Sequence, residues 1–123
     1  MTLADAIRKG AMQREQGVGK LYDDDLHVSC ALGAAAEGVF GPLEYQRKSQ
    51  IPDRLRREFP DLRTPDQSVQ CPECREMESL WDVVGRHLND EHGWTREQIA
   101  DWLDTLETRR ASTRTARRPD GRG

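Results

Sequence analysis

The sequence of 123 residues lacks the features of a membrane or exported protein. No stretch approaches the roughly 18 consecutive apolar residues that indicate a membrane span, and the N-terminal segment MTLADAIRKG has no apolar run typical of a signal peptide. Only three cysteines are present, at positions 30, 71 and 74, an odd number that fits a disulfide framework poorly. We therefore expect a soluble cytoplasmic protein whose cysteines are thiols or metal ligands.

Apolar side chains are also scarce. Hydrophobic residues make up 35% of the chain and charged residues 33%. The apolar surface that must offset the cost of ordering the backbone is small, so a cross-link such as a bound metal would add needed stability. A chain of this length has room for one small domain, and the lobes of a large enzyme are excluded.

The charges are distributed unevenly. Residues 109–123 contain six arginines and one aspartate, a net charge of +5, which leaves −8 for residues 1–108 because the whole chain carries −3. The low apolar content of 109–123 predicts a disordered basic tail. This tail either has no function or acts as a polycation, which binds nucleic acid or folds against an acidic patch of a partner or of the protein's own body. The candidate contact residues are Arg109, Arg110, Arg114, Arg117 and Arg118.

Apolar residues at helical spacing predict a mainly α fold of about five short helices. Thr2 is the expected cap of the first, and Ser29 that of a second, alanine-rich helix that should pack centrally and stop near Gly38 and Gly41. The other three are expected over 52–59, from Leu80 to near Gly93, and over 95–106, where a Thr95–Gln98 capping box begins the last helix.

These elements predict a small single domain in three stretches. Residues 1–70 form an N-terminal helical part with a proline-rich linker, and residues 71–108 form a zinc knuckle with a C-terminal helical hairpin. Residues 109–123 are the basic tail.

Four residues of the second stretch form the most specific motif, Cys71, Cys74, His87 and His92. Their spacing, Cys-x2-Cys-x12-His-x4-His, falls within the range of Cys2His2 zinc sites. Two thiolates from one tight turn and two imidazoles from one helix surround a tetrahedral Zn²⁺ and leave no open position for substrate. We therefore expect a structural zinc that contributes on the order of 10 kcal/mol to folding, and we expect a chelator to unfold residues 70–108.

Two alternatives remain open for this site. The four residues occur together by coincidence, or His27 or Cys30, in the pair His27-x2-Cys30, replaces one of the histidine ligands. No catalytic triad, phosphate-binding glycine loop or pair of catalytic acids is recognisable in the sequence, so we do not expect an enzyme.

The ligand spacing resembles the Cys2His2 zinc-finger family, over Cys71 to His92 only. The resemblance implies an aromatic core residue at position 78 and a leucine at position 84, where this chain has Glu78 and Val84. It also places base-reading side chains at 80, 83 and 86. Two of these are Leu80 and Val83, which cannot hydrogen-bond a base edge, and the acidic body would be repelled by phosphates. We therefore do not expect this helix to read DNA.

A second resemblance extends further along the chain. The segments LADAIR (3–8), SCALGA (29–34) and HLNDEHGWTREQIADWL (87–103) resemble a group of small uncharacterised proteins encoded by bacteriophages and prophages. The resemblance implies a viral or mobile-element origin and a host-cell cytoplasmic location, and it implies no activity.

Together these observations predict a non-enzymatic, zinc-stabilised module that binds a host or viral protein through its acidic body. The alternative is a nucleic-acid-associated regulator that uses the arginine-rich tail. A hydrolytic metalloenzyme ranks last, because it requires an open metal position.

Overall fold

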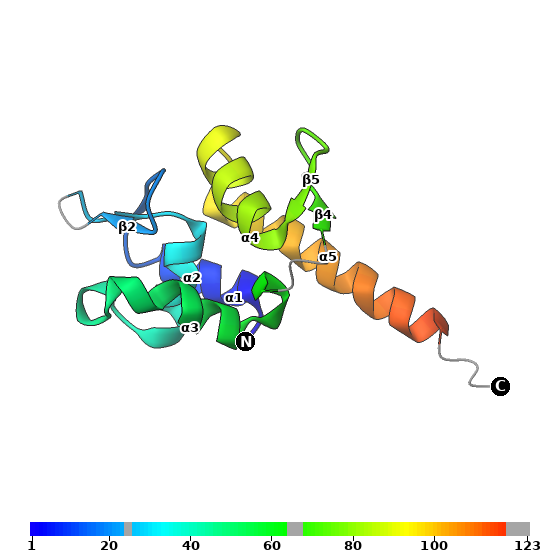
Figure 1. Cartoon of the computed structure of the whole chain (residues 1–123), viewed down its shortest axis with the longest axis horizontal. Coiled ribbons are helices and arrows are strands. Elements are labelled where there is room, and N and C mark those ends of the chain that lie inside the picture. Colours follow the sequence, from blue (N-terminus) through cyan, green and yellow to red (C-terminus); the bar gives the residue numbers. More distant parts are fainter. Residues whose placement is uncertain (24–25, 64–67, 118–123) are drawn as a thin grey trace.

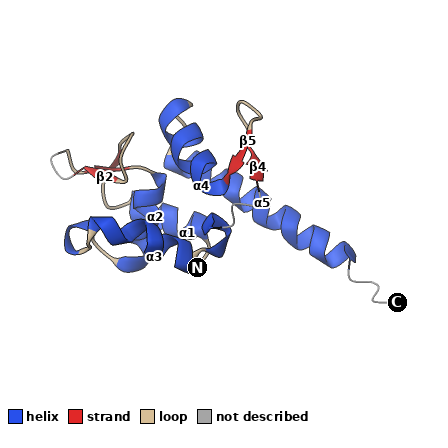
Figure 2. Cartoon of the chain, viewed as in Figure 1, coloured by secondary structure: helices blue, strands red, loops and turns tan. Residues whose placement is uncertain are grey.

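The computed structural model describes residues 1–23, 26–63 and 68–117, with side chains for 1–23, 26–62 and 68–106. The chain is mainly α-helical (Figure 2), as the sequence predicts. The helices are α1 (Leu3–Ala11), α2 (Ala31–Phe40), α3 (Ile51–Glu58), α4 (Leu80–Asp82), which continues directly as the π-helix η4 (Val83–Glu91), and α5 (Arg96–Arg117). Short 3-10 turns are η1 (Leu43–Tyr45), η2 (Lys48–Gln50) and η3 (Pro60–Arg63).

Helix α2 lies at the centre of the fold and packs closely against α1 (Figure 1). Every residue from Ala31 to Gly38 is buried, which confirms the expected central position of this helix. Glycines permit the close approach: a Cβ atom added at Gly10 would lie 1.7 Å from the backbone oxygen of Ala34, and one at Gly38 would lie 2.1 Å from that of Ala6. The small side chains of α2 thus let two backbones come together.

The ends of α1 and α2 show one confirmed cap and one wrong prediction. Thr2 caps α1, since its Oγ1 accepts a hydrogen bond from the backbone N–H of Asp5 at 3.1 Å. Ser29 was the expected cap of α2, but Cys30 occupies that position and its Sγ accepts from the N–H of Gly33 at 3.5 Å. Ser29 belongs to a strand instead, and its hydroxyl accepts a hydrogen bond from the buried Arg96 guanidinium. Gly41, with φ of +96°, ends α2.

Helix α5 packs along α1, and Arg8 joins the two through charge. The Arg8 guanidinium contacts Glu97, Asp101 and Asp104 of α5 at 2.9, 2.7 and 2.7 Å. These contacts raise the pKa of Arg8 above its ordinary value, first through the Asp104 hydrogen bond. The N-terminal half of the chain and the C-terminal hairpin therefore share one core.

Helix α5 is longer than predicted. Its backbone continues to Arg117 and projects from the body (Figure 1), whereas the sequence predicted irregular chain from 109 onward. The side chains of 107–117 and all of 118–123 lie outside the described residues, so the expected roles of Arg109, Arg110, Arg114, Arg117 and Arg118 stay predictions. Among the described residues, no helix is both long and apolar enough to cross a membrane.

Two small sheets were not predicted. In the first, β3 (Val28–Ser29) lies between β1 (Glu15–Gln16), which is parallel to it, and β2 (Tyr22–Asp23), which is antiparallel. In the second, β4 (Ser68–Gln70) pairs with β5 (Met77–Ser79), and Gln70 lies opposite Met77. The second sheet positions the two motif cysteines, because they lie in the loop between its strands.

Candidate metal centre

The loop between β4 and β5 forms a closed knuckle. Cys71 donates its backbone N–H to the carbonyl of Glu76, and its own carbonyl accepts from the N–H of Arg75, both at 2.9 Å. Arg75 has φ of +68°, so the chain turns back through the left-handed region directly after Cys74. These bonds fix the separation of Cys71, which is fully buried, and Cys74, which is exposed.

The two histidines lie on a helix whose unusual geometry suits their spacing. Residues five apart point about 140° away from one another on a regular α-helix. Here the segment Val83–Glu91 is a π-helix, and the N–H of His92 bonds to the carbonyl of His87 at 2.8 Å. The wider turn places both imidazoles on one side, with ring centroids 5.9 Å apart.

The structure brings all four motif residues together. One sulfur or nitrogen atom from each of Cys71, Cys74, His87 and His92 lies within 4.8 Å of the others. The Sγ of Cys74 is 3.4 Å from Nδ1 of His87. Two ligand atoms of a tetrahedral zinc, one sulfur and one nitrogen, are about 3.6 Å apart at normal bond lengths. The cluster can therefore hold a metal ion.

The unpaired ring nitrogens support the same interpretation. Nε2 of His87 and Nε2 of His92 are buried, and neither has a hydrogen-bond partner in the described part of the chain. Buried nitrogens without a partner are costly, and metal binding is one explanation for them. Nδ1 of His87 lies 3.4 Å from Sγ of Cys74, and the buried Nε2 of the same ring lies 3.9 Å from Oε1 of Glu76. Glu76 therefore lies near this ring but beyond hydrogen-bond distance of it.

The surroundings of Cys74 favour its neutral thiol when no metal is bound. The pKa of the Cys74 thiol lies above its ordinary value: the N–H of Glu76 lowers it, but desolvation and the adjacent Cys71 raise it by more. Two thiolates side by side repel each other unless a cation lies between them. A bound metal would deprotonate both thiols and remove this conflict.

Neither alternative ligand joins the cluster. His27 is exposed, in a turn with φ of +54°, and Cys30 is buried at the start of α2. Burial raises the pKa of the Cys30 thiol, which suits a small core residue and not a metal ligand. The exchange of a histidine for His27 or Cys30 therefore finds no support in this geometry.

Asn89, which sequence reasoning missed, anchors the metal-binding helix to the rest of the chain. Its side chain is fully buried and makes four hydrogen bonds. Oδ1 accepts from Gln16 Nε2 at 2.7 Å and from the Ala31 N–H at 3.1 Å, while Nδ2 donates to the Gly17 carbonyl at 2.9 Å and to Asp90 at 2.8 Å. Asn89, which lies between His87 and His92 in the sequence, thus joins η4 to β1 and α2.

A second contact joins the helix end to the knuckle. Gly93, with φ of +67°, ends η4, and the indole N–H of the next residue, Trp94, donates to Glu73 of the knuckle at 3.0 Å. Thr95 and Gln98 then form the predicted capping box, with reciprocal bonds of 2.9 and 3.0 Å. The Trp94–Glu73 bond therefore joins the end of η4 to the loop that carries Cys71 and Cys74.

The helix face that reads bases in zinc fingers is occupied by packing. Leu80 is 5% exposed and Val83 is fully buried, while Arg86 forms ion pairs with Glu78 and Glu91 at 3.3 and 3.5 Å. The neighbouring Gly85 faces Leu32 of α2, because a Cβ added there would lie 3.1 Å from that side chain. The side of this helix that would face a DNA groove in a zinc finger therefore packs inside the protein, with Gly85 against α2.

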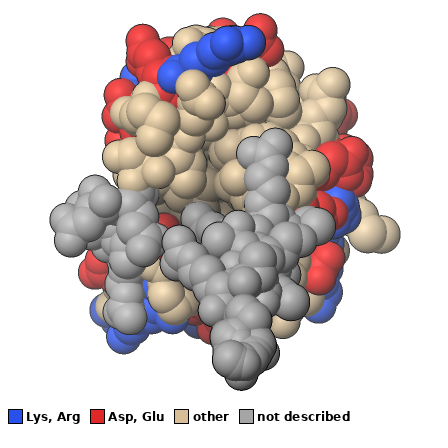
Figure 3. All heavy atoms as spheres, turned by 90° about the vertical axis from the view of Figure 1, so that its right-hand side faces the viewer, with Lys and Arg blue, Asp and Glu red and all other residues tan. Residues whose placement is uncertain are grey.

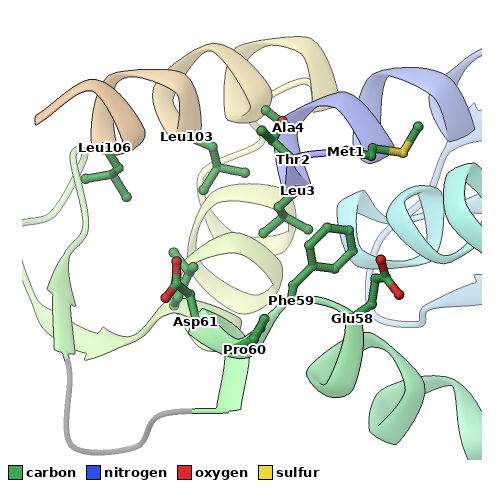
Figure 4. Close-up of a pocket in the computed structure, with 11 residues that line it drawn as sticks. Met1, Thr2, Leu3, Ala4, Glu58, Phe59, Pro60, Asp61, Leu103 and Leu106 are labelled. Carbon is green, nitrogen blue, oxygen red and sulfur yellow. The ribbon is translucent and has the colours of Figure 1, made fainter. Parts of the chain in front are cut away.

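An apolar cavity of about 340 Å³ lies away from the metal cluster, among α1, α3, η3 and α5. Figure 4 shows Leu3, Phe59, Leu103 and Leu106 around the opening. Its polar lining consists of Thr2, whose hydroxyl caps α1, and the carboxylates of Glu58 and Asp61. The cavity therefore presents mainly apolar surface, with one hydroxyl and two carboxylates in its lining.

Comparison with protein-family models, with curated protein sequences and with solved structures finds no match to this chain.

Proposed function

We propose that this chain is a non-enzymatic protein-interaction module stabilised by one structural Zn²⁺. Two thiolates and two imidazoles are the donor set that zinc favours, and four protein ligands leave no position for water or substrate. When bound, the ion would supply a cross-link between the knuckle and the helix. The observation that carries the proposal is the convergence of Cys71, Cys74, His87 and His92.

The surface around this centre supports a protein partner over DNA. Residues 71–108 contain ten acidic and three basic residues, a net charge of −7. A surface of this charge repels phosphates, and the base-reading face of the helix is buried against α2. We infer that the partner is a host or viral protein that contacts the acidic segment 71–108. The phage or prophage origin of the chain is part of this proposal and is supported by the sequence resemblance alone.

Affinity capture with matched variants tests this function. The immobilised, zinc-loaded wild-type chain is compared with a double variant that carries Asp82→Asn and Glu91→Gln. The two substitutions remove two negative charges from residues 71–108. The control is Glu15→Gln combined with Asp53→Asn, an equal charge change at exposed residues elsewhere. We expect one host protein to bind the wild type and the control and to be lost from the first variant. Equal recovery by all three proteins, or no bound protein, would refute the proposal.

The second candidate function, nucleic-acid association through the arginine-rich tail, is supported by the course of α5. The helix leads residues 109–117 away from the acidic body (Figure 1), which lowers the repulsion that nucleic acid would meet there. Replacing Arg109, Arg110, Arg114, Arg117 and Arg118 with glutamine tests it. Retention on DNA at low salt that does not change would exclude the tail as the contact.

A further inference from the structure

The metal centre does not account for the apolar cavity among α1, α3, η3 and α5. Its volume of about 340 Å³ falls within the range of ligand-binding pockets, about 300–1,000 Å³. An engineered apolar cavity of about 150 Å³ binds one benzene molecule, so this cavity has room for roughly two apolar groups of that size. Two apolar side chains of a ligand would therefore fit inside it.

The walls of the cavity come from both halves of the chain. Figure 4 shows Leu3 of α1 and Leu103 and Leu106 of α5 pointing toward residues 58–61, which form the opposite side. Leu80 also lines the cavity and, like Leu103, belongs to the buried core, whereas Leu3 and Leu106 are only half-buried. The core thus fixes the shape of the cavity, and two half-buried leucines leave apolar surface open to a ligand.

Two carboxylates lie in the lining beside this apolar surface. Glu58, the last residue of α3, and Asp61 of η3 are both exposed. Asp61 has another interaction, but among the described residues no hydrogen bond or ion pair engages the Glu58 side chain. With the N-terminal ammonium of Met1, which also lines the cavity, these groups carry a net charge of −1. A cationic group of a ligand is therefore favoured next to the apolar surface.

The acidic segment 71–108 adjoins the cavity. Leu80, Leu103 and Leu106 belong to this segment, which carries a net charge of −7. Figure 3 views the molecule from the side on which α5 projects and shows Asp and Glu side chains on both sides of an uncharged central area. A ligand that extends beyond the cavity along this segment therefore meets a surface complementary to positive charge.

We propose that the cavity binds a segment of a partner protein in which two apolar side chains adjoin lysine or arginine. The apolar side chains enter the cavity, as the anchors of an amphipathic helix enter a groove, and a cation contacts Glu58. Nucleic acid would place its phosphates beside the carboxylates, and a small alkylammonium ion would leave the acidic segment without a contact. The proposal rests on the proposed protein-interaction function and names the chemistry of the partner's binding segment.

NMR of the full zinc-loaded chain with ¹³C-labelled leucine methyl groups tests the proposal. The probe is a short synthetic peptide of leucine and lysine, with its leucines at helical spacing. The methyl signals of Leu43 and Leu88, which are buried elsewhere in the core, should not move. We expect the peptide to shift the signals of the four leucines in the lining, Leu3, Leu80, Leu103 and Leu106. This map is obtained on the wild-type protein, so it does not depend on the folding of a variant.

Matched variants test the role of charge. Glu58→Gln combined with Asp61→Asn should weaken peptide binding roughly 2- to 30-fold, the effect of two exposed ion pairs, and binding should also weaken as salt is raised. Glu15→Gln combined with Asp53→Asn makes an equal charge change at exposed residues outside the lining and should bind as the wild type does. Equal binding by both variants would overturn the assigned contact with Glu58.

Other occupants give different results. The proposal is overturned if the peptide shifts none of the four cavity leucines, or if a peptide with glutamate in place of lysine binds equally well. It is also overturned if octylammonium binds more tightly than the peptide, or if the cavity signals shift on raising the protein concentration alone, which would make a second copy the occupant. The capture experiment depends on Asp82 and Glu91, which lie outside the lining, so the two proposals fail separately.

Discussion

Replacing Asn89 with alanine should destabilise the fold more than any other change of a single polar side chain that we consider. The substitution removes four hydrogen bonds and leaves the buried N–H of Ala31 and the half-buried carbonyl of Gly17 without their partner. Each lost bond is worth about 1 kcal/mol, and each buried group left unpaired costs about 1–3 kcal/mol. We expect a loss of roughly 4 kcal/mol, which is close to the whole stability of a marginal domain.

Urea unfolding followed by circular dichroism, at saturating zinc, measures this loss. The control is Gln98→Ala, which removes one half of the exposed capping box and should cost at most about 1 kcal/mol. Asn89→Asp keeps the acceptor oxygens, loses both donors and adds a buried charge beside Asp90, so it should not restore stability. An unfolding free energy of Asn89→Ala within about 0.5 kcal/mol of the wild-type value is the size of a surface substitution. That result would show that the Asn89 hydrogen bonds do not hold η4 in place.

Three further predictions follow from buried contacts. Gly10→Ala should prevent the close approach of α1 and α2, because its Cβ would overlap the backbone oxygen of Ala34; a melting temperature equal to that of the wild type would contradict this packing. Glu37→Gln should cost about 3 kcal/mol in chemical unfolding, since it leaves the buried Arg14 charge without its main partner; a cost near zero would show that the pair contributes no stability. The pKa of Cys30 is raised by burial, so at pH 8 its thiol should react with iodoacetamide only when urea is added, as measured by mass spectrometry; rapid labelling of the native protein would place this side chain at the surface.

The helices were predictable because their signals are local. Thr2, the Thr95–Gln98 pair and the spacing of apolar residues lie within a few positions of the structures that they specify. The metal cluster was predictable for a related reason, since the separations of its four residues are themselves the motif. The mainly α class agrees with the structure, and each of the five predicted helices has a helical counterpart, although α5 continues to Arg117 and most of the fourth helix is a π-helix.

The contacts that join distant segments were not predictable. The strands of the first sheet are two residues long, too short for an alternating pattern to appear in the sequence. Asn89 bonds to Ala31 and Gln16 across 58 and 73 positions, and nothing near Asn89 indicates these partners. The cap of α2 was misassigned to Ser29 because serine is the commoner capping residue, whereas Arg96, far along the chain, engages the Ser29 hydroxyl.

Elemental analysis of the purified, folded chain tests the central claim most directly, since the account requires a single ion bound to Cys71, Cys74, His87 and His92. We predict one zinc per chain, lost together with helical circular dichroism when excess chelator is added at neutral pH. Folded protein that contains no metal, and whose helix content does not change in chelator, would contradict the account.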